Sequence, residues 1–451
     1  MTRAQDIREK MLEALKEKQK NMIPTSRTGR FGSMAKSAIR GALIYRKGKK
    51  NMDGEDELPL DTEQLVKLIT SVGQLKGIAM KMGQIMSYID MAIPKEMQEA
   101  LSVLQTHAQS MPFKKVTEII QAEPGLNGNH LLLKMEEEPV SAASIGQVHR
   151  AILPDGTTAA VKIQYPEIAK SIISDFGPAS AGTKMASIFF PNAHIDNFIT
   201  EAKDRFLEEC DYKHEAHCQE IFAAIYKDHP VIQIPSVHEK YCTQKILTTT
   251  FVDGISFENY LLTNPSQHER NIIGEALFEF YIGSLFRHQI YNCDPHPGNY
   301  LFHKNGKITM LDHGCTRQFE PSFVARLANL TSAIHSNNND EIHNALIGLK
   351  IVKEGKKYDF EMIHGFLKSF YGAMLKDETC KVNLSEAIEM REVFKKKQQL
   401  MKFSLPGEFT FLFRIRFGLM SVLSRLQSEA NWYQLEHKYV NDFAKKFPLL
   451  S

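Results

Sequence analysis

The sequence has no apolar run of about 18 residues or more, the length that a membrane-spanning helix needs. The nearest candidate, residues 409–423, is interrupted by Arg414 and Arg416, and this pattern is typical of an amphipathic helix. The N-terminus also lacks the apolar core of about 7–15 residues that a cleavable signal requires. We therefore expect a cytoplasmic protein without a signal peptide or transmembrane helix.

Cysteine and net charge are also low. The six cysteines form no Cys-x-x-Cys pair, which argues against a zinc site or a disulfide framework and indicates a reducing compartment; they are Cys210, Cys218, Cys242, Cys293, Cys315 and Cys380. The net charge is only +2, so nucleic-acid binding is not expected. With 43% hydrophobic residues and 18 prolines, the 451-residue chain can bury a large core.

The first 50 residues are an exception, because they contain far more Lys and Arg than Asp and Glu. Ile7, Met11 and Leu15 would share one face of a helix there, so this segment could make peripheral contact with anionic membrane lipid. A solvated, partly disordered arm fits the same composition. Residues 47–60 are rich in charge and glycine, which is typical of a linker.

Three polar residues near position 300 have the spacing of a phosphate-transfer site. Asp294 is followed five residues later by Asn299, and Asp312 begins an Asp-x-Gly sequence after two apolar runs that flank Asn305 and Gly306. Asn-Gly between such runs predicts a β-hairpin, which would bring Asn299 and Asp312 to the same end. In kinase-like folds this Asp faces the nucleophile, while the Asn and the second Asp hold Mg²⁺. The alternative is a surface loop with two solvated carboxylates.

Upstream lie a candidate phosphate lysine and a loop of small residues. Residues 157–164 predict a buried strand carrying Lys162, although a lysine on an edge strand is often only solubilising. Where a glycine-rich loop would be expected, the chain has Ala142, Ala143 and Ser144. Alanine does not take positive φ as readily as glycine, so this loop should be stiffer than that of an ordinary protein kinase.

With these motifs, the chain resembles the UbiB/AarF family of atypical kinases. The resemblance rests on the alanine-rich loop, on Lys81-Met82-Gly83-Gln84, on the acidic segment 208–216 and on Asp294-Pro295-His296-Pro297-Gly298-Asn299. It runs from about residue 65 to the Asp312 region and more loosely to the C-terminus.

The resemblance implies a role for each matched residue. Lys162 would be the nucleotide lysine and Glu209 its ion-pair partner, with Asp294 as the catalytic carboxylate. The nucleotide would contact Ala142, Ala143, Ser144 and Asp253. Asp253 would lie in a hinge at residues 248–254. Asn299 and Asp312 would bind Mg²⁺. Lys81, Gly83 and Gln84 would belong to a regulatory helix in which Lys81 meets Glu215, although periodicity alone also fits a plain amphipathic core helix.

Two departures from the family pattern stand out. His313 replaces the phenylalanine of Asp-Phe-Gly, so we expect the apolar packing of that position to be lost while the metal ligand is retained. Before Asp294 the chain has Tyr291, Asn292 and Cys293, where many relatives have His and a small residue. His296 is then the nearest imidazole, either as a structural hydrogen-bonding group or as a proton shuttle.

We therefore predict an α+β, kinase-like, two-lobed fold in four parts: a basic arm and linker at 1–58, a helical Lys-x-Gly-Gln extension at 59–125, an N-lobe at 126–255 and a C-lobe at 256–451. Strands are expected near 131–135, 145–153, 158–164 and 244–251, with helices between 167 and 225. Further helices are expected at 271–288, 323–335, 341–349, 360–375, 387–403 and 408–425.

Three functions fit the sequence. The first is a UbiB-type kinase or ATPase that uses ATP and Mg²⁺ and supports lipid or isoprenoid-quinone metabolism, as the resemblance implies. The second is a small-molecule phosphotransferase related to antibiotic kinases, which the Lys81–Gln84 element and the alanine-rich loop disfavour. The third is a nucleotide-binding scaffold without turnover.

Overall fold

A computed structural model describes residues 110–126, 134–143, 145–166, 168–170, 207–383 and 407–448. Several predictions fall outside these residues: the basic arm at 1–58, the regulatory residues Lys81, Gly83 and Gln84, the loop residue Ser144, and the helix at 387–403. Contacts divide the chain into two compact units. The sheet unit extends to His214 and includes His238–Phe251, and the helical unit comprises Glu215–Val237 and Val252 onward.

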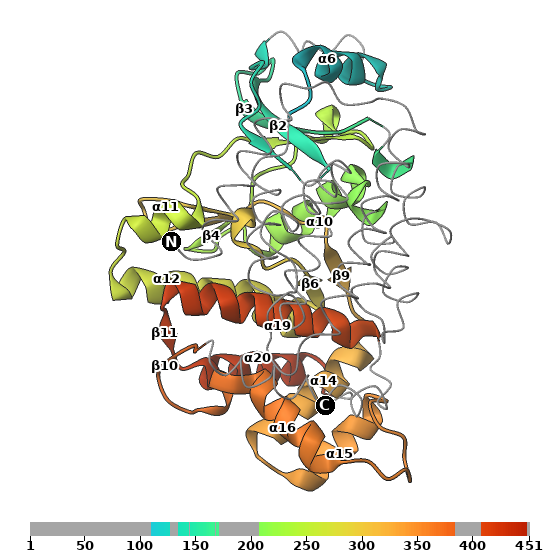
Figure 1. Ribbon diagram of the computed structural model, residues 1–451, viewed down its shortest axis with the longest axis vertical. Coiled ribbons are helices and arrows are strands. Elements are labelled where there is room, and N and C mark those ends of the chain that lie inside the picture. Colours follow the sequence, from blue (N-terminus) through green and yellow to red (C-terminus); the bar gives the residue numbers. More distant parts are fainter. Residues whose placement is uncertain are drawn as a thin grey trace, which may run out of the picture. The chain divides into compact units, whose positions relative to one another are not determined.

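The sheet unit is built on an antiparallel sheet with strand order β1-β2-β3-β5, of which β2 and β3 are labelled in Figure 1. Its strands are β1 (Ser141–Ala142), β2 (Gly146–Ile152), β3 (Thr158–Gln164) and β5 (Ile246–Thr250). Three of the predicted strands are thus confirmed. The one expected at 131–135 lies mostly outside the described residues, and its last residue, Met135, forms a bridge to Ala151. Helix α6 (Phe113–Ala122) belongs to this unit.

Apolar and polar contacts fix α6 to the sheet unit. Val116 and Ile120 are its buried residues. The buried Gln147 side chain of β2 accepts from the Met111 N–H at 2.6 Å and donates to the Met111 carbonyl at 3.1 Å. Glu123, at the end of α6, pairs with Lys245 at 2.7 Å.

The described part of the helical unit contains three small sheets among its helices. Strand β4 (Ile232–Gln233) pairs in parallel with β8 (Ile308–Met310), and β8 pairs antiparallel with β7 (Tyr300–Phe302). Strand β6 (Ile290–Asn292) pairs antiparallel with β9 (Thr316–Gln318), and β10 (Cys380–Lys381) with β11 (Glu429–Ala430). The β7–β8 hairpin confirms the prediction from Asn305-Gly306, and Gly306 has φ +76° at the turn, which glycine adopts without strain.

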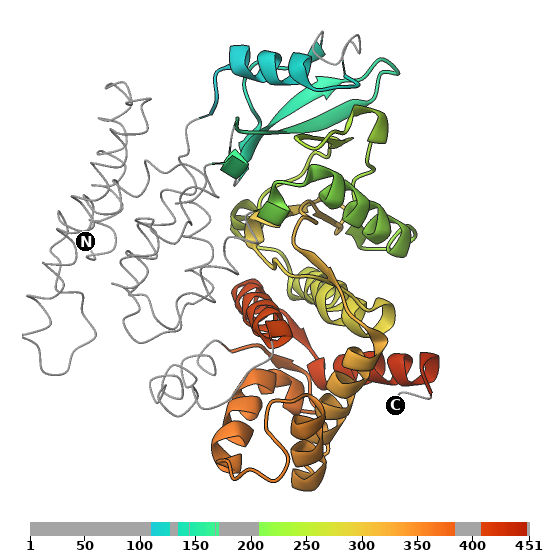
Figure 2. The ribbon, with the colours of Figure 1, turned by 90° about the vertical axis from the view of Figure 1, so that its right-hand side faces the viewer.

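Helices make up most of this unit, as Figure 2 shows. They include α10 (Tyr212–Ile225), within which the division falls, together with α11 (Phe257–Leu262), α12 (Gln267–Phe278), α13 (Ser284–His288), α14 (Pro321–His335), α15 (Asn339–Gly348), α16 (Phe360–Tyr371), α19 (Gly407–Leu426) and α20 (Trp432–Lys446). The predicted helices at 323–335, 341–349 and 408–425 are confirmed, and the one at 360–375 ends in a 3₁₀ turn, Gly372–Leu375. Helices α11 and α20 were missed. No helix among the described residues is long and apolar enough to cross a membrane.

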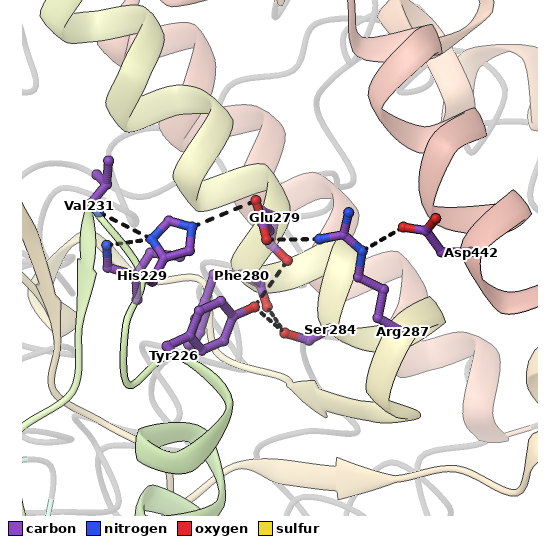
Figure 3. A network of polar contacts seen from close by, with 9 residues as sticks. Tyr226, His229, Val231, Glu279, Phe280, Ser284, Arg287 and Asp442 are labelled. Atoms are coloured by element: carbon purple, nitrogen blue, oxygen red, sulfur yellow. Dashed lines mark hydrogen bonds and ion pairs between the residues drawn. The ribbon is translucent and has the colours of Figure 1, made fainter. Parts of the chain in front are cut away.

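The predicted helix 271–288 is interrupted by a π-helical turn, Glu279–Gly283. Figure 3 shows the contacts around it: the Glu279 carboxylate pairs with Arg287 at 2.8 Å, and Arg287 also reaches Asp442 of α20 at 2.8 Å. The Ser284 hydroxyl donates to the Phe280 carbonyl at 2.6 Å and lies 2.7 Å from the Tyr226 hydroxyl. These contacts hold the turn between α10 and α20.

Candidate active site

The Asp294 loop and the Asp312 motif are each held between the same two strand pairs. The loop connects β6 to β7, and the motif connects β8 to β9, so both are bracketed by the β6–β9 and β7–β8 ladders. Two backbone hydrogen bonds continue these ladders: the Cys293 N–H donates to the Cys315 carbonyl at 2.7 Å, and the Leu311 N–H donates to the Asn299 carbonyl at 2.9 Å. Residues 22 and 12 positions apart in sequence are thereby joined, one pair at each end of the two segments.

The Asp294 carboxylate is oriented by Asn299. The Asn299 amide nitrogen donates to Asp294 Oδ2 at 3.1 Å and to its carbonyl at 3.1 Å, and Asp294 is only 6% exposed. The Tyr281 hydroxyl, which lies 2.9 Å from the buried Tyr300 hydroxyl, donates to the same carbonyl at 3.4 Å. Asn299 therefore holds the carboxylate of Asp294, and Asn299 and Tyr281 together hold its carbonyl, an arrangement that a general base would need.

Asn292 connects the two motifs, a role that the sequence pattern did not indicate. Its side-chain oxygen accepts from the Asp294 N–H at 3.0 Å, and its amide nitrogen donates to the Asp312 carbonyl at 2.7 Å. Asn292 is 2% exposed, so both hydrogen bonds are shielded from water. The signal available in the sequence was an amide side chain two residues before Asp294.

Around Asp312, the oxygen atoms suit a hard divalent cation. The Gly314 N–H donates to Asp312 Oδ1 at 3.0 Å. The amide nitrogen of Asn299 donates to the Asp294 carboxylate, so the amide oxygen of Asn299 faces away from that carboxylate. The described residues contain no cluster of three His, Cys, Asp or Glu that could hold a metal by itself. One carboxylate and one amide oxygen nevertheless fit Mg²⁺, since that ion is usually bound by one or two carboxylates together with substrate phosphates.

Glu215 lies beside this motif. Its side chain is buried at 2% exposure, and a Cβ added to Gly314 would lie 3.4 Å from both Glu215 Oε2 and Asp312 Oδ1. The carboxylates of Glu215 and Asp312 therefore both lie beside the backbone of Gly314. Lys81, the partner that the resemblance implies for Glu215, is outside the described residues.

The structure corrects the expectation for His313. Its side chain is fully buried, with its ring 5.2 Å from that of Phe222 in α10 and 6.3 Å from that of Phe280 in the π-helical turn. The packing expected to be lost is kept, because an imidazole is flat enough to fill the space between two aromatic rings.

His296 has the structural role that the sequence analysis considered. Its Nδ1 accepts from the Gly298 N–H at 3.0 Å, which fixes the turn Pro297–Asn299.

The hinge segment is tied to the β7–β8 hairpin. Ile255 and Phe302 exchange two backbone hydrogen bonds, of 3.0 and 2.9 Å, and Asp253 is exposed. A Cβ on Gly254 would lie 2.8 Å from Leu301 Cβ, so only glycine fits there. The contacts of Asp253 with a nucleotide stay a prediction.

In the sheet unit, Lys162 lies on the central strand β3, opposite Val148 and Leu247. A central position does not support the alternative of a solubilising lysine on an edge strand. The Lys162 ammonium lies 5.0 Å from the centre of the buried Tyr212 ring. Glu209 and Lys162 are both half-buried in this unit, and their ion pair stays a prediction.

The alanine-rich loop is a tight turn. The Ala143 N–H donates to the Gly146 carbonyl at 2.9 Å, and neither Ala142 nor Ala143 has positive φ. Gly146 packs directly against β3, since a Cβ there would lie 2.2 Å from the Ile163 carbonyl oxygen. Ala142 and Ala143 therefore take none of the left-handed conformations that glycine allows, and the stiffness of the loop stays a prediction.

Comparison with known proteins identifies the fold and the family. Residues 103–346 match the ABC1 atypical kinase-like domain. The chain is 32% identical over 318 residues to the atypical kinase COQ8, mitochondrial, of Saccharomyces cerevisiae, a match covering 68% of this chain and 63% of that protein. It is 30% identical over 331 residues to the atypical kinase COQ8B, mitochondrial, of Rattus norvegicus, covering 71% of this chain and 62% of that protein.

A solved structure agrees. The complex of Rv3197 with erythromycin from Mycobacterium tuberculosis superimposes with a TM-score of 0.59 at 25% identity, covering 84% of this chain and 96% of that one. The matches to the two curated relatives above span somewhat less than two thirds of the length of each. The family match nevertheless extends over more than half of the chain, and the strand pairs described above place the Asp294 loop and the Asp312 motif together. The chain belongs to the ABC1 atypical kinase-like family that includes COQ8 and UbiB.

Proposed function

We propose that this protein binds Mg-ATP and transfers or hydrolyses its terminal phosphoryl group, with Asp294 as the general base. The observation that carries the proposal is the Asn299 amide, which donates to Asp294 Oδ2 while the Asn299 backbone is joined to Leu311, next to Asp312. Asp294 would take the proton of the attacking hydroxyl or water as the new P–O bond forms and the bond to ADP breaks. Lys162 would hold the nucleotide phosphates.

Asn299 and Asp312 would hold the metal, which would supply charge stabilisation on the phosphates. Glu215, buried beside Gly314, adds negative charge to the motif that a bound cation would offset. The setting in lipid or isoprenoid-quinone metabolism rests on the family resemblance alone. The choice between ATPase and kinase depends on whether water or a substrate hydroxyl reaches Asp294.

The test compares two carboxamide variants of the full-length protein. Asp294→Asn should leave Mg-ATP affinity within about threefold of wild type but lower turnover by roughly a hundredfold, the scale of a positioned general base. Asp312→Asn should instead abolish the Mg²⁺-dependent part of nucleotide binding, measured by calorimetry with and without the metal. Unchanged single-turnover hydrolysis in Asp294→Asn would reject the base assignment.

The same assay distinguishes the remaining functions. Wild-type turnover that rises with liposomes supports a lipid-linked substrate. Nucleotide binding without turnover, alone or with liposomes, indicates a scaffold.

A further inference from the structure

The Asp294 loop contacts a glycine of helix α19, far along the chain. Pro295, which follows Asp294, is buried, and Gly418 lies in the second half of α19. A Cβ added to Gly418 would lie 2.4 Å from Pro295 Cγ and 3.4 Å from both Pro295 Cβ and its carbonyl oxygen. The proline ring therefore occupies the space where any other residue at position 418 would place its side chain.

Helix α19 is itself firmly anchored. Arg416, two residues before Gly418 and so about 200° away around the helix axis, is 6% exposed. Its guanidinium forms an ion pair with the fully buried Glu436 of α20 and lies 4.4 Å from the Tyr371 ring centre and 4.8 Å from that of Phe370. Ile415, Leu419 and Leu423 are also fully buried. Contacts on different sides of the helix therefore fix its rotation about its own axis and its position in the core of the helical unit.

We propose that α19 is a positioning element for the catalytic loop, with Gly418 as the contact that sets the place of Pro295 and hence of Asp294. The inference rests on the proposed function for the role of Asp294, but the contact itself does not. α19 lies beyond residue 346, where the family match ends, so this support comes from a part of the chain that the match does not include.

Gly418→Ala is the direct test. Ordinary van der Waals contact begins near 3.4 Å, so the 2.4 Å contact would force Pro295 and the helix apart by about 1 Å. Misplacing a catalytic group by about 1 Å can cost roughly a hundredfold in rate. We expect kcat for ATP to fall about ten- to hundredfold while KM for ATP changes less than threefold, because the nucleotide lysine and the hinge are not touched.

Two further variants separate positioning from general damage. Pro295→Ala removes Cγ, the ring atom nearest to Gly418, so Pro295→Ala/Gly418→Ala should recover most of the kcat lost in Gly418→Ala. Gly365→Ala is the matched control, since this glycine also lies in a helix, α16, and a Cβ there meets nothing within 4 Å. It should keep wild-type kcat. A double variant as slow as Gly418→Ala, or equal rates in Gly418→Ala and wild type, would overturn the proposal.

Hydrogen exchange decides the contact even if the protein does not turn over ATP. The loop amides of His296 and Asn299 donate to the carbonyls of Asp294 and His296, at 2.8 and 2.9 Å. Peptides covering residues 293–302 should exchange several-fold faster in Gly418→Ala and return toward wild type in the double variant. Unchanged loop exchange in Gly418→Ala would overturn the positioning role. Absent turnover in wild type, with the exchange result as expected, would reject only the proposed function.

Discussion

Replacing Asn292 with alanine should weaken both the fold and the catalysis. The change removes the acceptor of the Asp294 N–H and the donor to the Asp312 carbonyl, two hydrogen bonds of 3.0 and 2.7 Å made by a side chain that is 2% exposed. A buried hydrogen bond contributes about 1 kcal/mol net, and taking away one partner costs about 1–3 kcal/mol. We expect a loss of about 2–4 kcal/mol in the free energy of unfolding and a fall in kcat of roughly tenfold or more.

Asn292→Asp separates the two hydrogen bonds. The aspartate keeps an oxygen that accepts from the Asp294 N–H but cannot donate to the Asp312 carbonyl. The free energy of unfolding should therefore fall by at least the contribution of one hydrogen bond, and the Asp312 motif should be disturbed more than the Asp294 loop. Urea unfolding with linear extrapolation measures the free energy, and steady-state hydrolysis of Mg-ATP measures kcat.

Asn271→Ala serves as the control, because Asn271 also joins distant segments by accepting from the Glu429 N–H at 2.8 Å, but it does so away from the loop. It should lose stability and keep its kcat. Wild-type stability and turnover in Asn292→Ala, or an equal loss of turnover in Asn271→Ala, would refute the argument that Asn292 couples the two motifs.

Two other predictions concern the core of the helical unit. His313→Phe should keep the packing against Phe222 and Phe280 and change the unfolding free energy by less than about 1.5 kcal/mol, whereas His313→Ala should cost about 2–4 kcal/mol in urea unfolding; equal effects of the two would reject the packing role. Burial alone would raise the pKa of Glu436, but Arg416 and His335 outweigh it and hold that pKa below its ordinary value of 4.5. A carboxyl group whose pKa is lower in the folded than in the unfolded state stabilises the fold above its unfolded pKa, and this stability is lost as the pH falls through the folded pKa. Below about pH 4.5, wild type should therefore lose stability more steeply than Glu436→Gln, whose free energy of unfolding should already be lower by about 3–5 kcal/mol at neutral pH. Parallel pH profiles of the two proteins would contradict this.

Local signals explain which parts of the fold were predictable. The β7–β8 hairpin follows from Asn305-Gly306, where a turn residue with positive φ sits between two short apolar runs. β2 and β3 were predictable for the same reason, with Asp155 and Gly156 in the turn between them. Helix α20 carried its own signal, since Asn431 caps it by accepting from the Gln434 N–H at 3.0 Å and its buried residues recur at helical spacing.

Contacts between distant residues were not predictable in this way. The spacing of Asp294, Asn299 and Asp312 indicated which residues meet, because one hairpin connects them. The role of Asn292 depends on the pairing of β6 with β9, and that register is set by burial rather than by a local turn. The packing of His313 likewise depends on Phe222 and Phe280, which come from two other elements.

The core of the helical unit also bears on where this domain can be cut. The match to the ABC1 atypical kinase-like domain ends at residue 346, but the buried core continues through α19 and α20 to Phe443. Trp432 is fully buried, its ring lies 5.3 Å from that of Phe278, and its indole nitrogen donates to the Cys380 carbonyl at 2.9 Å. A fragment excised at the end of the domain match would uncover the apolar surface around Phe278, and such surfaces promote aggregation. Recombinant fragments and truncating variants are therefore better judged by the packing boundary, near residue 448, than by the end of the domain match.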